Sequence, residues 1–279
     1  MEKLQKALQK AREQRITSPE PVDRLATDLL ARDSATRQDP ADDEAAALWD
    51  ALEGFEPSAK TLEKNRIVTA AAGPLGASFD ILRTKTMLTM RKNGWTRLAI
   101  TSPTMGCGKT TTACNLAIGY ARNPEVRTIL MEFDLRRPSV AKTLDLPVTA
   151  DLTDLLNGQT DFADHAFRYR RNVAVVAASK PSPDPTSLLI SKTTQTVLQD
   201  IEDRYAPDIM IFDLPPLLVT DDTRAVLKDV DCAILVARAG ATTVAQLDIC
   251  EREIAEHTNM LGIVLNQCRD VEDDYGYYG

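Results

Sequence analysis

The chain has 279 residues and a formal net charge of −8, and 43% of its residues are hydrophobic while 5% are aromatic. That length is enough for one large domain with its own core, and the composition excludes collagen, disulfide scaffolds and membrane bundles. No apolar run approaches the roughly 18 residues that a membrane span needs. The first fifteen residues carry seven charges where a signal peptide would be apolar. We therefore expect a chain that neither spans a membrane nor enters the secretory route.

The cysteine and histidine contents bear on disulfide bonds and on metal sites. The five cysteines are odd in number and lack CxxC spacing, which indicates reduced thiols in a cytoplasmic protein. The only histidines are His165 and His257, so a histidine-rich metal site is excluded. No basic surface interleaved with aromatic residues is evident, so we expect no nucleic-acid partner.

Two segments of unlike charge precede the apolar part of the chain. Residues 1–16 are predicted to form a basic amphipathic helix, with Leu4 and Leu8 on its thin apolar stripe. It is either a docking element for an anionic membrane or a partner, or a solvated helix without one. Residues 17–63 are acidic and contain four prolines, which predicts a disordered linker with one helical stretch around Trp49.

Short apolar runs alternate with helical patterns over the remaining chain, which is typical of an α/β fold: a mostly parallel sheet with helices on both faces. The expected strands are 97–100, 128–133, 172–178, 209–214, 232–237 and 262–266. The expected helices are 78–93, 109–122, 186–203, 221–229 and 242–257. We predict one domain over residues 64–268, with ligands beyond the carboxyl ends of the strands, and a flexible tail over 269–279.

The strongest motif is AITSPTMGCGKTTTACNLA, in which an apolar strand runs into a glycine loop and then a helix. Gly106 and Gly108 let backbone N–H groups turn inward as an anion nest, and the helix N-terminus adds positive potential. This pattern predicts that Lys109 reaches the β and γ phosphates and that the Thr110 hydroxyl ligates Mg²⁺. The strict pattern has glycine where this sequence has Pro103. The predicted phosphate-binding residues are Met105, Gly106, Cys107, Gly108, Lys109, Thr110 and Thr111.

Acidic side chains end two further strands. Glu132 and Asp134 leave an apolar strand two residues apart, so we expect both to point the same way. Two such carboxylates repel unless a cation or a proton lies between them, and Mg²⁺ is the natural partner; a solvated acidic strand end is the alternative. Asp213 ends the strand IMIF before Pro215 and Pro216, a pattern typical of a magnesium carboxylate beside a phosphate loop.

Together these motifs resemble the cytoplasmic bacterial tyrosine autokinases of capsule and exopolysaccharide synthesis, the CpsD/CapB type. The resemblance covers residues 76–279 and includes FDILRT (79–84), LTDLLNG (152–158), PSPDPTSLL (181–189) and GIVLNQ (262–267). It implies a P-loop NTPase-like kinase domain that uses ATP and Mg²⁺, with the metal held by Thr110, Asp134 and Asp213. It also implies that Glu132, where the family usually has Asp, acts near the attacking hydroxyl as base or metal ligand. The implied catalytic residues are Lys109, Glu132, Asp134 and Asp213.

The C-terminal sequence VEDDYGYYG places Tyr275, Tyr277 and Tyr278 beside acidic residues and glycines. The family uses such a cluster as its own phosphoryl acceptor, delivered in trans to a neighbouring subunit, whereas the alternative is an inert end. The resemblance further implies a membrane polysaccharide co-polymerase as activator, a cognate phosphotyrosine phosphatase, self-association, and a position at the inner face of the cell membrane.

Departures from the family at Glu132 and in the ring-forming helix leave other functions open. The family's ring-forming helix usually reads E-x-x-R-x-x-R, and of the corresponding Ala77, Asp80 and Arg83 only the last matches, so a closed ring through this helix is not expected. A nucleotide-dependent assembly switch without kinase activity is one alternative. A partitioning-type ATPase is the other, but it would carry a signature lysine where this chain has Thr104.

Overall fold

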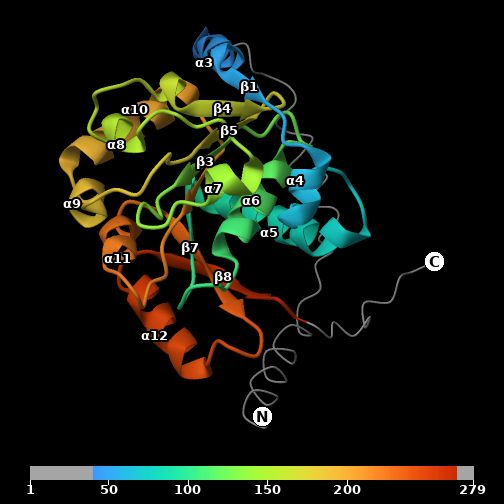
Figure 1. Ribbon diagram of the computed structural model, residues 1–279, viewed down its shortest axis with the longest axis vertical. Helices are drawn as coiled ribbons and strands as arrows, with labels where there is room; N and C mark the ends of the chain where they lie inside the picture. The colour runs from blue at the N-terminus through green and yellow to red at the C-terminus, as the bar shows by residue number, and fades with distance from the viewer. Residues whose placement is uncertain (1–39, 269–279) are drawn as a thin grey trace. The chain divides into compact units, whose positions relative to one another are not determined.

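The computed structural model describes residues 40–268, and the chain divides into two units, Met1–Glu44 and Ala45–Gly279. The predicted N-terminal helix and the tyrosine-bearing tail lie outside the described residues. Figure 1 shows the described residues, nearly all of which belong to the second unit.

One sheet forms the centre of this unit, and its strand order is β1-β4-β5-β3-β6-β2-β7-β8. All neighbouring strands pair in parallel except β4 and β5, so β1 and β4 run opposite to the other six. The mostly parallel sheet predicted from the apolar runs is therefore confirmed. The strands are β1 (Glu53–Phe55), β2 (Arg97–Thr101), β3 (Thr128–Glu132), β4 (Ala166–Tyr169), β5 (Val173–Val176), β6 (Ile209–Asp213), β7 (Cys232–Arg238) and β8 (Asn259–Asn266).

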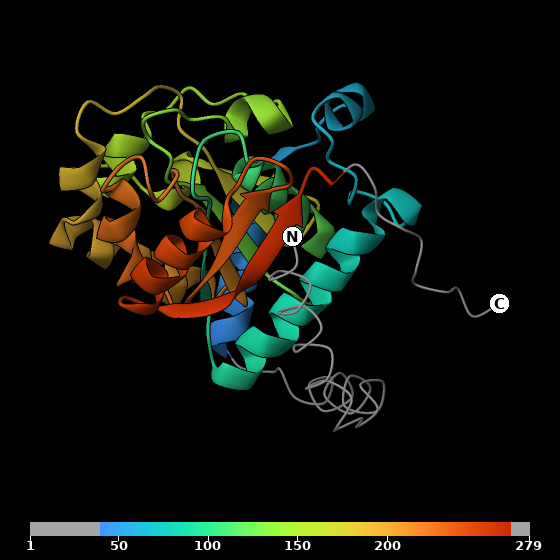
Figure 2. The same cartoon turned by 90° about the horizontal axis from the view of Figure 1, so that it is seen from below.

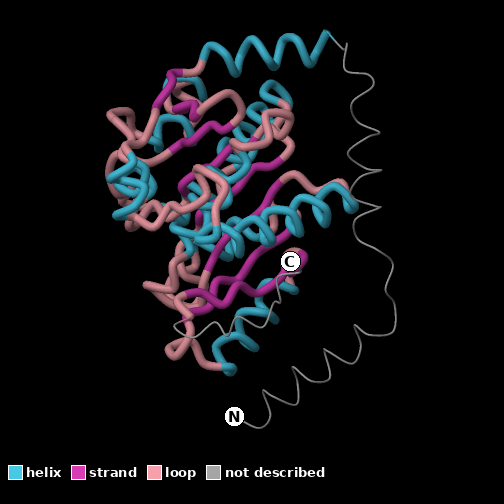
Figure 3. The backbone as a smooth tube through the Cα atoms, turned by 90° about the vertical axis from the view of Figure 1, so that its right-hand side faces the viewer, coloured by secondary structure: helices cyan, strands magenta, loops and turns pink. Residues whose placement is uncertain are grey.

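Helices cover both faces of the sheet, as Figures 2 and 3 show. The helices of the first face are α4 (Ala59–Lys64), α5 (Ala77–Asn93), α6 (Lys109–Tyr120) and α7 (Val140–Leu144). Those of the second face are α8 (Leu152–Leu156), α9 (Pro185–Leu189), α10 (Lys192–Tyr205), α11 (Asp222–Leu227) and α12 (Val244–Ala255). No helix in residues 40–268 is long and apolar enough to cross a membrane.

Alternation along the strands builds a separate core on each face. In β3, Ile129 and Met131 belong to the core beneath α8–α12, whereas Leu130 belongs to the core beneath α4–α7. Successive side chains of a strand point to opposite faces, so a strand covered on both sides is apolar throughout. This is why the central strands could be predicted as continuous apolar runs.

Part of the predicted linker is folded, which corrects the expected boundary at residue 64. Trp49 lies on α3 (Pro40–Ala51), is 2% exposed, and donates from Nε1 to the Tyr205 carbonyl oxygen at 2.8 Å. Strand β1 extends the sheet beside β4. Acidic composition predicted disorder, but the stretch buries a few apolar side chains such as Leu52, and a three-residue strand has no periodicity to detect.

The other differences from the predicted elements are local. The single helix expected over 186–203 is two helices, because the chain turns after α9 and Ser191 caps α10 by accepting a hydrogen bond from the Thr194 N–H at 3.0 Å. Strand β4 and the short helices α4, α7 and α8 were not expected. All five cysteines are free thiols, as predicted.

Candidate active site

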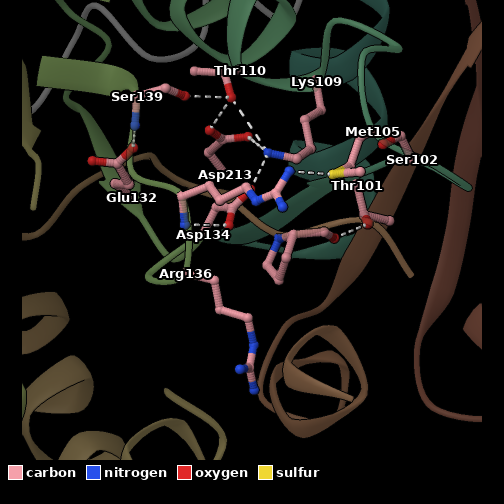
Figure 4. Close-up of polar contacts among 12 residues, drawn as sticks. Thr101, Ser102, Met105, Lys109, Thr110, Glu132, Asp134, Arg136, Ser139 and Asp213 are labelled. Atoms are coloured by element: carbon pink, nitrogen blue, oxygen red, sulfur yellow. Dashed lines mark hydrogen bonds and ion pairs between the residues drawn. The ribbon is translucent and has the colours of Figure 1, made fainter. Parts of the chain in front are cut away.

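Three strand ends meet at one edge of the sheet. Ile100 of β2 and Glu132 of β3 are both register partners of Asp213 in β6. The loops that leave these strands carry the three sequence motifs, so the parallel pairing gathers the motifs in one place (Figure 4).

The glycine loop after β2 adopts a conformation that only glycine takes readily. Gly106 and Gly108 have φ angles of 77° and 92°, in the left-handed region. A Cβ on Gly108 would also meet the Nδ2 atom of Asn266, so any larger residue there would have to displace the Asn266 side chain. Gly108 caps α6, which begins at Lys109. The helix N-terminus and the loop N–H groups together form a site suited to an anion.

Lys109 and Thr110 connect this loop to the two acidic motifs. The Lys109 ammonium lies 2.7 Å from Oδ2 of Asp134 and 3.8 Å from Oδ1 of Asp213. The Thr110 hydroxyl donates to Oδ2 of Asp213 at 2.6 Å and accepts from the Ser139 hydroxyl at 3.3 Å. The structure therefore brings together Lys109, Thr110, Asp134 and Asp213, as the sequence predicted.

The charges in this cluster depend on one another. Burial raises the pKa of Asp213, and the nearby Lys109 ammonium and Thr110 hydroxyl only partly oppose it. Burial alone would lower the pKa of Lys109, but Asp213 and Asp134 outweigh it and raise this pKa. The ammonium is therefore held charged, and it is the cation that the two carboxylates share.

The oxygen atoms at this site fit a hard divalent cation. Asp213 is 0% exposed, and its Oδ1 atom accepts no hydrogen bond within the described residues. Asp134 and the Thr110 hydroxyl supply further oxygens nearby. No group of three or more His, Cys, Asp or Glu side chains that could hold a metal occurs in the described chain. The donor set thus suits Mg²⁺, which binds through one or two carboxylates, water and substrate phosphates.

Glu132 does not join this cluster, which corrects its predicted place beside Asp134. Its Oε1 atom accepts hydrogen bonds from the N–H groups of Ser139 and Val140 at the start of α7, and its Oε2 atom accepts one from Ala178 N–H at 2.9 Å. Figure 4 shows its carboxyl group directed toward Ser139 rather than toward Lys109. The expected same-side projection fails because β3 ends at Glu132, so the alternation of a strand does not extend to Asp134.

Burial also changes the chemistry of Glu132. It raises the pKa of this carboxyl group to about 7, although the three N–H donors act in the opposite direction. With both oxygens engaged by backbone groups and 0% of the residue exposed, Glu132 joins β3 to α7 and to the chain after β5. This geometry indicates a structural role for Glu132, and it does not place the carboxyl group with Lys109 and Asp134.

A cavity of about 380 Å³ opens over the cluster. Its lining comprises Met105, Gly106, Gly108, Lys109, Thr110, Thr111, Asp134, Arg136, Arg137, Ser139, Pro215, Pro216, Val219 and Thr220. Six of the seven predicted phosphate-binding residues are in this set. Cys107 is absent because its side chain is 1% exposed and its thiol faces the hydroxyls of Thr104 and Thr242. A larger cavity, of about 460 Å³, lies between α8 and α10 and contains no residue of the three motifs.

Arg136 and Arg137, the two arginines after Asp134, contact different parts of the structure. Arg136 binds Asp222 through two hydrogen bonds, of 2.6 and 3.0 Å, and approaches the Thr186 hydroxyl at 3.4 Å. It points away from Lys109, as Figure 4 shows. Arg137 donates to the sulfur of Met105 at the mouth of the cavity. The sequence could not assign these partners, because Asp222 and Thr186 belong to distant helices.

Sequence reasoning also missed residues that hold the glycine loop. Asn266 donates to the Cys107 carbonyl oxygen at 2.9 Å, and Gln267 donates to the Gly106 carbonyl oxygen at 3.0 Å. The available signal was the GIVLNQ motif, in which Asn266 ends the strand predicted over 262–266 and Gln267 follows it.

These features define a P-loop α/β protein with a nucleotide-binding site. No family model matches the chain. It is 31% identical to the tyrosine-protein kinase YwqD of Bacillus subtilis over 183 residues, which cover 64% of this chain and 76% of that protein. The solved kinase domain of VpsO is 27% identical, with a TM-score of 0.63 over 74% of this chain and 98% of that one.

The fold agrees with a further solved structure, the kinase domain of the Escherichia coli tyrosine kinase ETK. It is 22% identical, with a TM-score of 0.67 over 81% of this chain and 94% of that domain. The chain belongs to the bacterial tyrosine-protein kinase family, and it is a protein-tyrosine kinase. The predicted P-loop fold and the resemblance on which it was based are confirmed.

Proposed function

We propose that this kinase transfers the γ-phosphoryl group of MgATP to tyrosines of its own C-terminal segment, Tyr275, Tyr277 and Tyr278, and so regulates the polymerisation and export of a capsular polysaccharide or exopolysaccharide. The observation that carries the proposal is the cluster of Lys109, Asp134 and Asp213 at the N-terminus of α6.

Phosphoryl transfer needs mainly positioning and charge neutralisation, and this chain supplies both. Phosphate oxygens bound at the start of α6 would meet N–H groups of the loop and the helix N-terminus, and the Lys109 ammonium would supply positive charge to them. Thr110, Asp134 and Asp213 would hold Mg²⁺. Bound there, the ion would neutralise charge on the β and γ phosphates.

The acceptor hydroxyl has its own requirement. Tyrosine has a pKa near 10, so a carboxylate beside the attacking oxygen helps to orient it and accept its proton. Of Glu132, the last residue of β3, and Asp134, just beyond it, only Asp134 lines the cavity. We therefore assign the orienting role to Asp134 in place of Glu132.

The test is to incubate the purified full chain with ATP and Mg²⁺ and to map phosphotyrosine by mass spectrometry. We expect Lys109→Met to abolish labelling, and a triple Tyr→Phe exchange of the tail to remove most of it while preserving nucleotide affinity. Nucleotide binding without tail phosphate would favour the assembly switch, and labelling that survives Lys109→Met would contradict the site.

A mixing experiment addresses transfer between subunits. The Lys109→Met chain keeps its tyrosines, whereas the triple-Phe chain keeps its Lys109. If transfer occurs in trans, the mixture gains phosphotyrosine on the Lys109→Met chain, although that chain is unlabelled alone and the triple-Phe chain alone is labelled only weakly. An unlabelled mixture of chains that both remain folded would restrict transfer to a single subunit.

The proposed partners are a membrane polysaccharide co-polymerase as activator, a cognate phosphotyrosine phosphatase and a second copy of the chain, at the cytoplasmic face of the membrane. Arg83, the remaining base of the ring motif, donates to the Gly119 carbonyl oxygen at 2.6 Å and lies 3.6 Å from Asp80, which also pairs with Arg122. Because these contacts engage Arg83 within its own subunit, we propose that self-association does not use a closed ring through α5. Stimulation of labelling by the activator's cytoplasmic segment tests the first partnership.

A further inference from the structure

The end of β8 contacts the back of the glycine loop. The side-chain amides of Asn266 and Gln267, which we call the amide pair, donate to the carbonyl oxygens of Cys107 and Gly106, at 2.9 and 3.0 Å. Two neighbouring residues thus hold two consecutive carbonyls of a loop that lies about 160 positions earlier. Neither member of the amide pair lines the cavity.

This contact orients the donors of the loop. In a trans peptide the C=O of one residue and the N–H of the next point in opposite directions. A carbonyl held against β8 at Gly106 therefore turns the N–H of Cys107 away from β8, and the same holds for Cys107 and Gly108. Within residues 40–268, no backbone carbonyl outside the helices and strands accepts a hydrogen bond from the N–H of Gly108, so this N–H is available to an anion.

The amide pair is itself held in place. Asn266 Oδ1 accepts a hydrogen bond from Gln267 N–H at 2.8 Å, which fixes the amide of Asn266 with its Nδ2 toward Cys107. Gln267 has a φ of 59°, in the left-handed region that residues other than glycine rarely adopt. Strain of this kind persists where surrounding contacts impose it and collects at functional sites.

We propose that Asn266 and Gln267 are positioning residues that keep the phosphate loop in its anion-binding conformation, so that nucleotide affinity depends on the end of β8. This inference deepens the proposed function and rests on it only in taking the loop as the site for nucleotide phosphates. It assigns the amide pair an effect on binding through the loop backbone, without contact to the reacting atoms.

Two variants of Gln267 separate this role from a contribution to stability. Gln267→Met keeps the size and the strained φ but removes the donor, whereas Gln267→Gly removes the donor and relieves the strain. Ala206→Gly is the matched control, since Ala206, the C-cap of α10, has a φ of 42° and precedes β6, whose far end carries Asp213. The measurements are the Kd for ADP by isothermal titration calorimetry, the Tm by circular dichroism, and the KM and kcat for ATP.

We expect both Gln267 variants to weaken ADP binding by about five- to tenfold, the loss that corresponds to one net hydrogen bond. The KM for ATP should rise by the same factor while kcat changes by less than about twofold. Gln267→Gly should nevertheless have an unchanged or higher Tm, as Ala206→Gly should, and Ala206→Gly should bind ADP as the wild type does. Asn266→Ala should weaken ADP binding by at least as much.

The results distinguish failure of this inference from failure of the proposed function. Wild-type affinity for ADP in both Gln267 variants would overturn the positioning role alone. The inference would also be overturned if Gln267→Met bound ADP more weakly and had a lower Tm while Gln267→Gly matched the wild type in both. Gln267 would then be a structural residue. A wild-type chain without measurable affinity for ATP or ADP would contradict the proposed function, and the amide pair's role with it.

Discussion

Glu132→Gln tests whether this acid holds the fold or carries out the chemistry. The substitution keeps the shape of the side chain but replaces one oxygen with an NH₂ group. If the remaining oxygen accepts from Ser139 and Val140, the NH₂ group faces the Ala178 N–H, which loses its acceptor. A buried donor without a partner costs about 1–3 kcal/mol, and the two other bonds become weaker neutral ones.

Relief from burying a charge offsets part of this loss, so we expect a net destabilisation of about 2 kcal/mol. For a domain of this size that lowers the Tm by about 4–8 °C. The labelling rate, measured well below both transitions, should stay within about threefold of the wild type, whereas removal of a general base would reduce it by about 10²–10⁴-fold. The assays are thermal unfolding by circular dichroism and time courses of phosphotyrosine formation.

Glu132→Asp is the companion variant. Its carboxylate is one methylene shorter and retracts from all three N–H groups, so it should be less stable than the wild type even though it restores the acid that the family usually has. A rate that falls by more than 100-fold in Glu132→Gln with an unchanged Tm would refute the structural role.

Three further predictions follow from burial and charge. The pKa of Glu132 is about 7 in the folded protein and 4.5 ordinarily, so between these pH values the folded protein keeps a proton that the unfolded chain has lost. The free energy of unfolding, measured by urea titration, should therefore fall by at most about 3 kcal/mol as the pH rises from 4.5 to 7. Glu132→Gln should remove this pH dependence. Arg136→Ala leaves the buried carboxylate of Asp222 without its cation, so unfolding free energy should fall by about 1–2 kcal/mol, less in combination with Asp222→Ala; additive losses would contradict a coupled pair. Trp49→Ala should lower the free energy of unfolding by about 3–5 kcal/mol, because it removes a buried ring and its hydrogen bond to Tyr205. A decrease below about 1 kcal/mol would show that α3 does not contribute to the core.

The sequence alone determined the features that depend on neighbouring residues. The loop from Met105 to Thr111 could be predicted because strand, glycines, lysine and helix are contiguous, and the φ angles at Gly106 and Gly108 need glycine whatever surrounds them. Asp213 could be predicted because it ends an apolar strand that is buried on both faces. Parallel pairing then places these strand ends at one edge of the sheet.

Only the tertiary structure decided which side chains meet across the sheet edge. Glu132 and Asp134 look equivalent in sequence. In the structure, however, Glu132 accepts hydrogen bonds from Ala178 and the start of α7, whereas Asp134 pairs with Lys109. Strand β1 and the amide pair likewise exist through contacts with residues more than 100 positions away. Hydrophobic periodicity reports which face of an element is covered, but a buried polar group is satisfied by whichever donors the folded chain brings within reach, and no local pattern encodes them.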